Sequence, residues 1–184
     1  MSELFNPMKR YSKYYMLQLR HLHKISSEFG ARRDLSEDME DCIARYSPKT
    51  FLDYGCGKGG LLKMLNRRIP NCCVGYDPAI EEYSAEPSGP SEMLISTDVL
   101  EHIEPNYIDA VLQHIDKHFS LVAYLLIATK PAKKTLPDGR NTHLIQEGPD
   151  WWRRKILENI DANIAYEKFD LDKFILVLEK ERVE

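Results

Sequence analysis

One short segment constrains the fold of this chain more than any other: an apolar run enters a turn with four glycines and leaves it as a helix. The run is TFLDYG (Thr50–Gly55), the turn continues through CGKGG, and the segment GLLKMLNRR has helical spacing. A strand, a glycine-rich turn and a helix form the local unit of α/β folds that bind a ligand against the turn. We therefore expect a ligand site at the carboxyl end of this strand.

The alternation of strands and helices continues along the chain. Further apolar runs are CCVGYD (72–77), EMLIST (92–97) and LVAYLLIAT (121–129), and NIAYEKF with KFILVLEK forms a predicted C-terminal hairpin. Alternating strands and helices favour a parallel sheet covered on both faces. The prediction is an α/β, doubly wound, mostly parallel sheet with an antiparallel hairpin at its end.

Helical spacing predicts helices over residues 7–25, 34–46, 106–119 and 150–160. Asp34 followed by Glu37 is typical of a capping box at the start of the second helix. A length of 184 residues suits a single domain over 1–184. Within it, 1–47 would be a helical extension that could act as a lid, and 48–184 the catalytic core.

Composition narrows the class of protein. Hydrophobic residues make up 43% and charged residues 29%, an ordinary globular balance. The sequence has no apolar run of the roughly 18 residues that span a bilayer and no apolar signal-peptide core at its start. Four cysteines without zinc-type spacing indicate reduced thiols and a cytoplasmic protein. Nothing in the sequence indicates an oligomeric state.

Charge is unevenly distributed. Residues 1–33 hold seven Lys or Arg residues against two acidic ones, a net charge of +5 that leaves −9 for the remainder, because the total is −4. A basic, tyrosine-rich leader on an acidic body could attract an anionic substrate, although a solvated helix face explains the same pattern.

The glycines fit two ligand templates. Gly55, Gly57 and Gly60 match the dinucleotide fingerprint, whereas Asp53 with Gly55, Gly57 and Gly59 matches the pattern of enzymes that use S-adenosylmethionine (SAM). A carboxylate beside the loop would repel a pyrophosphate but would favour the sulfonium and ammonium groups of SAM. Asp77 ends the next strand, 24 residues after Asp53, and suits the ribose hydroxyls. Ala79 and Ile80 could pack against adenine.

Three motifs in order, FLDYGCGKGG, VGYDP and ISTDVLEHIEP, resemble class I SAM-dependent methyltransferases over most of residues 50–180. The resemblance implies a Rossmann-like methyltransferase fold and SAM as the cofactor. It implies that the glycine-loop residues and Asp53 lie along the methionine part of SAM and that Asp77 binds the ribose. The cofactor-binding residues are then Asp53, Gly55, Cys56, Gly57, Gly59, Asp77, Pro78 and Asp98.

One stretch departs from the family. About 14 residues separate Asp77 from Glu92, where the family usually has a helix, a strand and another helix. We expect a shortened sheet edge there, with a short helix and at most a remnant of a strand. Ser84 and Glu86 are the candidates for contact with the adenine amino group.

The segment DVLEH places Asp98, Glu101 and His102 where they would share one face of a helical turn. In the family this segment faces the transferred methyl group. Three interpretations remain open. The carboxylates could favour a helix N-terminus, His102 or Asp98 could orient or deprotonate an acceptor hydroxyl, or the cluster could hold a divalent metal ion.

His143, in LPDGRNTHLI, follows the strand expected over 121–129 and could reach the same rim as a fourth ligand. Asp98, Glu101, His102 and His143 are therefore the predicted catalytic residues and the candidate ligands of Mg²⁺ or Mn²⁺. The set is similar to that of plant-type small-RNA 2′-O-methyltransferases, with Asp98 in place of a Glu. It also resembles ubiquinone-pathway O-methyltransferases, which carry similar LEH turns.

Basic residues lie near two tryptophans on the substrate side, where they could bind phosphates and stack rings, or where one tryptophan could simply anchor a helix. The residues are Lys130, Lys133, Lys134, Arg140, Trp151, Trp152, Arg153 and Arg154. With a pI of 5.9, the chain lacks the overall basic character that is typical of nucleic-acid enzymes.

The prediction is O-methylation of a small, anionic molecule. The alternatives are a metal-dependent RNA 2′-O-methyltransferase, an NAD-dependent oxidoreductase and a SAM-binding protein without catalysis.

Overall fold

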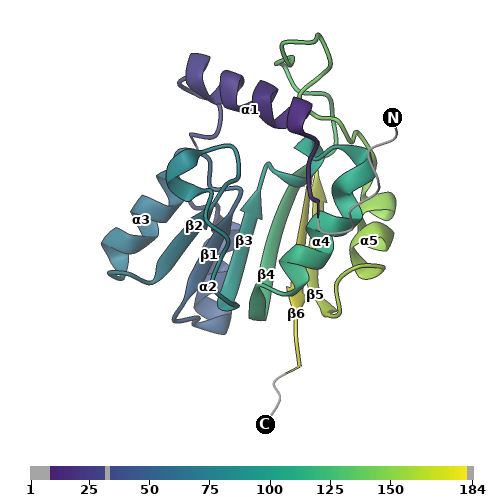
Figure 1. The fold of residues 1–184 in the computed structure, drawn as a ribbon. Helices are drawn as coiled ribbons and strands as arrows, with labels where there is room; N and C mark the ends of the chain where they lie inside the picture. The colour runs from purple at the N-terminus through teal and green to yellow at the C-terminus, as the bar shows by residue number, and fades with distance from the viewer. Residues whose placement is uncertain (1–8, 32–33, 182–184) are drawn as a thin grey trace.

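The structure, a computed structural model that describes residues 9–31 and 34–181, is built on a six-stranded sheet (Figure 1). The strand order is β2-β1-β3-β4-β6-β5, with β1, β2, β3 and β4 parallel and β6 antiparallel to both neighbours. The predicted doubly wound sheet and its terminal hairpin are confirmed. The strands are β1 Phe51–Tyr54, β2 Cys73–Tyr76, β3 Ser91–Thr97, β4 Phe119–Ala128, β5 Asn163–Asp170 and β6 Lys173–Glu179.

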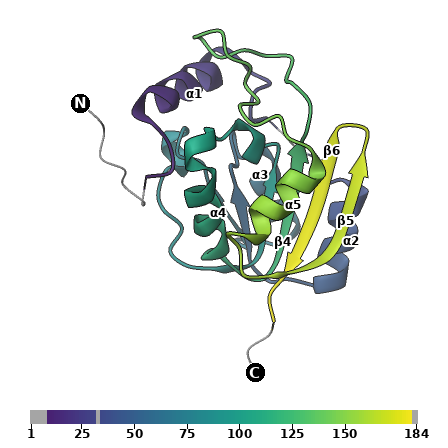
Figure 2. The ribbon, with the colours of Figure 1, turned by 90° about the vertical axis from the view of Figure 1, so that its right-hand side faces the viewer.

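Helices cover both faces of the sheet because its central strands are apolar on both sides. Along β3, Met93 and Ile95 pack toward α2 (Glu37–Tyr46) and α3 (Gly60–Arg68), whereas Leu94 packs toward the opposite face. That opposite face is covered by α4 (Ile108–Asp116) and α5 (Pro149–Leu157) (Figures 1 and 2). The alternating side chains of one strand thus pack in two separate hydrophobic cores.

A further helix, α1 (Lys13–Ile25), lies across the carboxyl end of the sheet rather than on either face (Figures 1 and 2). The expected start at residue 7 lies outside the described residues, and residues 9–12 are not helical, so the helix is shorter than predicted. It begins where it does because the Ser12 hydroxyl accepts a hydrogen bond from the Tyr15 amide, the bond expected of an N-cap.

The other helix boundaries also differ from the prediction. The predicted capping box is wrong, because α2 begins at Glu37 with Ser36, not Asp34, at the N-cap position. Residues 105–107 form a separate 3₁₀ turn before α4, and Phe119 already belongs to β4. Helix α5 ends at Leu157, three residues earlier than predicted.

The edge of the sheet beside β2 is short, as predicted. Between β2 and β3 the chain forms only a 3₁₀ turn, Glu81–Tyr83, and no strand. No helix within the described ranges has both the length and the apolar character needed to cross a bilayer.

Candidate active site

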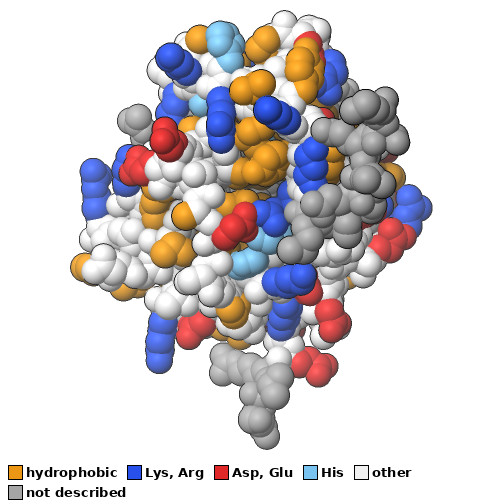
Figure 3. Space-filling model, in the orientation of Figure 1, with side chains coloured by type: hydrophobic (Ala, Val, Ile, Leu, Met, Phe, Trp, Pro, Cys, Tyr) orange, Lys and Arg blue, Asp and Glu red, His pale blue; other side chains and the backbone are white. Residues whose placement is uncertain are grey.

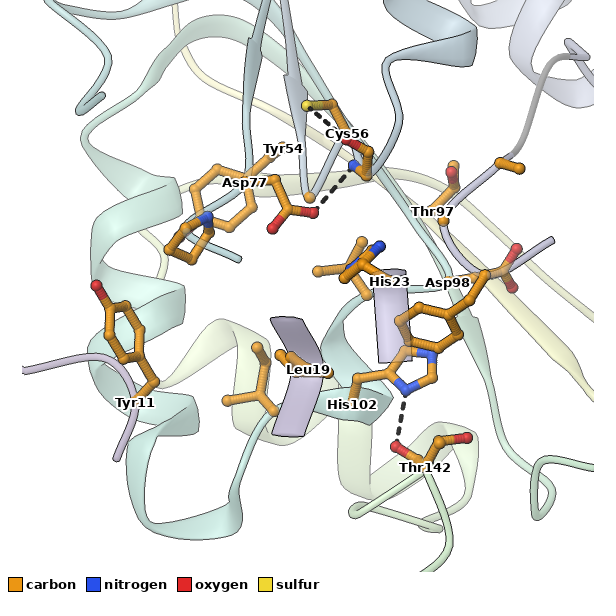
Figure 4. A pocket seen from close by; sticks show the side chains of 18 of the residues that line it. Tyr11, Leu19, His23, Tyr54, Cys56, Asp77, Thr97, Asp98, His102 and Thr142 are labelled. Atoms are coloured by element: carbon orange, nitrogen blue, oxygen red, sulfur yellow. Dashed lines mark hydrogen bonds between the residues drawn. The ribbon is translucent and has the colours of Figure 1, made fainter. Parts of the chain in front are cut away.

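A cavity of about 540 Å³ lies at the carboxyl ends of the parallel strands, under α1. Its floor includes Tyr54, Asp77 and Asp98, which end or follow β1, β2 and β3. Leu19 and His23 of α1 face them across the space, and Thr142 lies at one side (Figure 4). The volume falls within the range of sites that enclose a cofactor-sized ligand.

The glycine loop has the backbone that its sequence requires. Gly55, Gly57 and Gly59 have φ values of 78°, 52° and 69°, in the left-handed region. At Gly57 a Cβ atom would lie 2.4 Å from the Gly30 carbonyl oxygen, so only glycine fits at this close approach. Gly55 and Gly57 line the cavity, whereas Gly59 serves as the N-cap of α3 and does not.

Asp77 is held by this loop and by its own turn. One carboxylate oxygen accepts a hydrogen bond from the Gly57 amide at 3.0 Å, and the other accepts one from the Ala79 amide at 2.9 Å. Asp53, Cys56 and Pro78 also line the cavity. Burial raises the pKa of the Cys56 thiol well above its usual range, so this cysteine is a neutral packing group.

Helix α1 closes the cavity through side chains that sequence reasoning largely missed. The Tyr15 hydroxyl donates a hydrogen bond to the His102 carbonyl, and the Ser12 amide and hydroxyl both donate to Glu104, at 2.7 and 2.8 Å. His23 lines the cavity two turns after Tyr15, and its Nδ1 is buried without a hydrogen-bond partner. Its place on the Tyr15–Leu19 stripe was the signal that could have identified it.

The DVLEH segment is not the single helical face that was predicted. Asp98 has a φ of 55°, which takes it out of the turn, and only Leu100–His102 form a 3₁₀ helix. Glu101, His102 and His143 each offer one ligand atom within 4.8 Å of the other two. Asp98 lies outside this group, although it lines the cavity beside it.

Both histidines of this group are oriented by backbone carbonyls. His102 Nδ1 lies 2.7 Å from the Thr142 carbonyl oxygen, and His143 Nδ1 lies 2.6 Å from that of Lys130. A carbonyl oxygen only accepts, so each Nδ1 carries the proton and each Nε2 keeps its lone pair. The two rings meet edge to face with centroids 4.8 Å apart.

Burial favours the neutral forms of Glu101 and His102. Glu101 is fully buried, and this desolvation, with the charge of Asp98, raises its pKa to about 8. One Glu101 oxygen accepts a hydrogen bond from the Ala128 amide at 2.9 Å, and the other has no partner. Burial and the neighbouring His143 lower the pKa of His102 to about 4. The site thus presents a neutral His102 imidazole beside a buried carboxyl group that has one oxygen without a partner.

The basic and aromatic residues on the substrate side separate into two groups. Lys133 and Lys134 line the cavity. Trp152 is fully buried in the core, and Arg153 is held by Asp150 and Glu167, so neither reaches the site. The interpretation of one tryptophan as an anchor is correct.

The residues proposed for adenine do not line the cavity. Ser84 donates to the Glu81 carbonyl, and Glu86 is bound by Arg10 and His114. Ala79 and Ile80 are also absent from its lining. Tyr76, Tyr11 and Arg10 line the cavity instead.

Comparison with known proteins identifies the family. The family profile described as "Methyltransferase domain" matches residues 31–162. A search of curated proteins yields no significant match.

Solved structures share the fold at low identity. A 1,6-didemethyltoxoflavin-N1-methyltransferase from Burkholderia thailandensis has a TM-score of 0.63 at 12% identity, covering 99% of this chain and 93% of its own. The magnesium protoporphyrin IX methyltransferase of Synechocystis, with bound S-adenosylhomocysteine, has a TM-score of 0.62 at 16% identity, covering 91% and 100%.

An O-methyltransferase family protein from Burkholderia thailandensis has a TM-score of 0.57 at 13% identity and covers 93% of this chain. This chain spans 59% of that protein, less than two thirds of its length. The family match decides between the two glycine templates in favour of SAM. The chain belongs to the methyltransferase-domain family and is a class I SAM-dependent methyltransferase.

Proposed function

We propose that this enzyme transfers the methyl group of SAM to an oxygen of a small acceptor inside the cavity under α1. The observation that carries the proposal is the arrangement of one cavity with the glycine loop and Asp77 at one end and His102 and His143 at the other. An in-line transfer needs both substrates side by side, and one cavity lined by both sets of residues supports this arrangement.

The cofactor end would bind SAM through groups already in place. Asp77 keeps acceptor capacity on both oxygens for the ribose hydroxyls, and Asp53 places a carboxylate near the positively charged methionine end. Gly55, Cys56, Gly57 and Pro78 would contact the cofactor, and Gly59 would keep the loop in shape from outside the cavity.

The test of this assignment is calorimetric titration with S-adenosylhomocysteine. Asp77→Ala should weaken binding about 10- to 100-fold, because two hydrogen bonds to a charged group are lost. The control is Asp161→Ala, at an exposed position beside the end of α4, where the Asp161 amide donates to Asp116. Equal affinity in both variants would contradict the assignment.

Activity is tested by release of S-adenosylhomocysteine with a panel of phenols, catechols, carboxylates and sugars. Turnover on a hydroxyl acceptor supports O-methylation. Turnover only on amines would contradict O-methylation and assign nitrogen as the methylated atom. Binding of S-adenosylhomocysteine without turnover on any acceptor would favour a SAM-binding protein without catalysis.

We also propose that Glu101, His102 and His143 hold a divalent metal ion, as Mg²⁺ or Mn²⁺. The residues fit such an ion: Glu101 has a buried carboxyl oxygen without a partner, and both rings have Nε2 lone pairs oriented by carbonyls at Nδ1. A bound divalent ion would supply positive charge that lowers the pKa of an acceptor hydroxyl. Asp98 would act beside the ion on the acceptor or cofactor, not as a fourth ligand.

Thermal unfolding of protein stripped with EDTA, with Mg²⁺, Mn²⁺ or Zn²⁺ added back, tests this site without any acceptor. A metal-dependent rise in Tm that His143→Ala abolishes supports it. The control is His21→Ala, which is exposed on α1. If no ion raises the Tm, His102 becomes the group that orients or deprotonates the acceptor, as a neutral imidazole.

Finally, we propose that α1 is a lid. It contributes Tyr15, Leu19 and His23 to the cavity and is fastened at its start to Glu104, so exchange of SAM requires it to move. His23 would then reach the reacting groups only in the closed state.

A further inference from the structure

The outer face of the lid helix α1 is unusual for a surface helix. Its inner face already contributes Tyr15 and Leu22 to a small buried cluster with Leu136. Nevertheless Tyr14, Leu17 and Ile25 point outward, with 61%, 57% and 65% of their surface exposed. Burial of the inner face is enough to hold the helix on the domain, so folding does not explain the apolar residues on the outer face.

Cations accompany these apolar side chains. Lys13, Leu17, Arg20 and Lys24 follow one another at i, i+4, i+7 and i+11, so they form one outward stripe. Tyr14, His21 and Ile25 lie beside it at the same spacing. The helix contains no acidic residue. Its exposed face is therefore basic along one flank and apolar along the other, with Leu17 between them.

The loop after β4 extends this basic surface. It is joined to α1 by a hydrogen bond from Lys134 to the Ser26 hydroxyl, at 2.9 Å, and by bonds between Gln18 and Asp138. Lys130 and Lys133 of this loop are exposed, and Lys133 also lines the cavity. Figure 3 shows Lys and Arg side chains interspersed with hydrophobic ones over α1, at the top of the molecule.

Neighbouring acidic groups do not neutralise this surface. Glu28 lies 3.6 Å from Lys134, and Asp138 binds Arg140, so both are already matched by cations. Lys13, Lys24, Lys130 and Lys133 form no ion pair with any other described residue. Because the chain as a whole carries −4, an anionic surface would attract this end of the molecule and repel the rest.

We propose that the outer face of α1, with Lys130 and Lys133, docks the enzyme on an anionic lipid membrane surface. Lysines flanking exposed apolar side chains on one helix are the features of helices that lie in the headgroup region. Nucleic acid is the less favoured partner, because two of the three exposed apolar side chains, Leu17 and Ile25, are aliphatic and cannot stack on bases. Docking would turn the lid and the mouth of the cavity toward the lipid, so that the acceptor could enter from the membrane surface.

The experiment is co-sedimentation of the full chain with vesicles of phosphatidylcholine, with or without phosphatidylglycerol. The protein should bind only the anionic vesicles, and binding should fall as salt is raised. Lys13→Glu with Lys24→Glu should weaken binding by more than tenfold, and Leu17→Ser by about fivefold.

Matched controls lie at the opposite end of the molecule. Lys49→Glu with Arg67→Glu reverses two exposed cations near the amino ends of the strands, and Ile69→Ser replaces an aliphatic side chain that is 50% exposed. Neither should alter vesicle binding. Retained affinity for S-adenosylhomocysteine in every variant shows that the fold and the cofactor site are intact.

Three results would overturn the proposal. The first is equal binding to neutral and anionic vesicles, or to neither. The second is an equal loss in the control variants. The third is binding of a short RNA duplex, but not of vesicles, that depends on Lys13 and Lys24; it would assign the surface to nucleic acid instead.

Discussion

The glycine-loop end of the cavity and the proposed acceptor end differ in how far apart in the sequence their residues lie. Asp53, Gly57 and Asp77 belong to one strand–helix–strand unit, and its backbone bonds fix Asp77 directly. The acceptor end joins His23 of α1, His102 after β3 and His143 after β4. The first end is built by local geometry, whereas the second depends on α1 and the loop after β4 packing together in a small cluster of their own.

From this difference we expect substitutions in the glycine loop to have the largest effects on stability and cofactor binding. Gly57→Ala should destabilise the protein by about 3 kcal/mol and abolish S-adenosylhomocysteine binding, since the new methyl group adds a clash with Gly30 to the strain of a positive φ. Urea unfolding and calorimetry measure the two effects. Gly139→Ala is the control: its φ is 86° but nothing lies within 4 Å, so only about 1 kcal/mol should be lost. Similar losses in both would mean that strain, not close approach, dominates.

At the acceptor end the expected effect is a dependence on pH. Burial raises the pKa of Glu101 to about 8 from a usual value of 4.5, so the folded protein holds a proton that the unfolded chain releases. Its contribution to stability is complete below pH 4.5 and is lost progressively as the pH rises to about 8. Glu101→Gln should remove this component of the slope.

The measurement is unfolding by urea at a series of pH values, in EDTA. A bound divalent ion should flatten the wild-type slope, because it stabilises the ionised carboxylate. An unchanged slope in Glu101→Gln would show that other groups cause it. His102, whose pKa burial lowers to about 4, acts in the opposite sense, and its contribution is lost as the pH falls from 6.5 to 4.

The smallest effect is expected at Ser12, whose hydrogen bonds to Glu104 hold the start of α1. Ser12→Ala removes the N-cap of α1 and the hydroxyl bond to Glu104, at a cost of about 1 kcal/mol. Loosening of α1 should speed dissociation of S-adenosylhomocysteine several-fold, as measured by stopped-flow displacement, while Tm should fall by only about 2–4 °C. Ser36→Ala is the control, because its hydroxyl contacts Tyr124 beneath α2, away from the cavity. Equal rates in both variants would argue against a lid.

The sequence predicted the parts of the molecule that depend on short-range pattern. Apolar runs such as LVAYLLIAT and the glycine spacing of DYGCGKGG predicted the strands, the doubly wound sheet and the family. Helix ends were predicted less well, because Ser36 competes with Asp34 and because residues 105–107 close a tighter 3₁₀ turn. The hydrophobic periodicity of the sequence alone does not distinguish such turns from the first turn of an α-helix.

The acceptor end shows where pattern was insufficient. Helical spacing in DVLEH predicted a common face for Asp98, Glu101 and His102. The left-handed backbone at Asp98 removes this residue from the group. His23 was overlooked since a histidine on an amphipathic helix has no local mark of function; its role depends on α1 folding back over Asp77 and His102.

The sequence by itself determined the order of strands and helices, the shortened edge after β2 and the cofactor class, because each follows from neighbouring residues and backbone sterics. Only the tertiary structure decided that α1 lies over the cavity, that Glu101 is fully buried, and that His143 rather than Asp98 joins Glu101 and His102. These outcomes depend on the burial and desolvation of groups far apart in the chain, which no local pattern encodes.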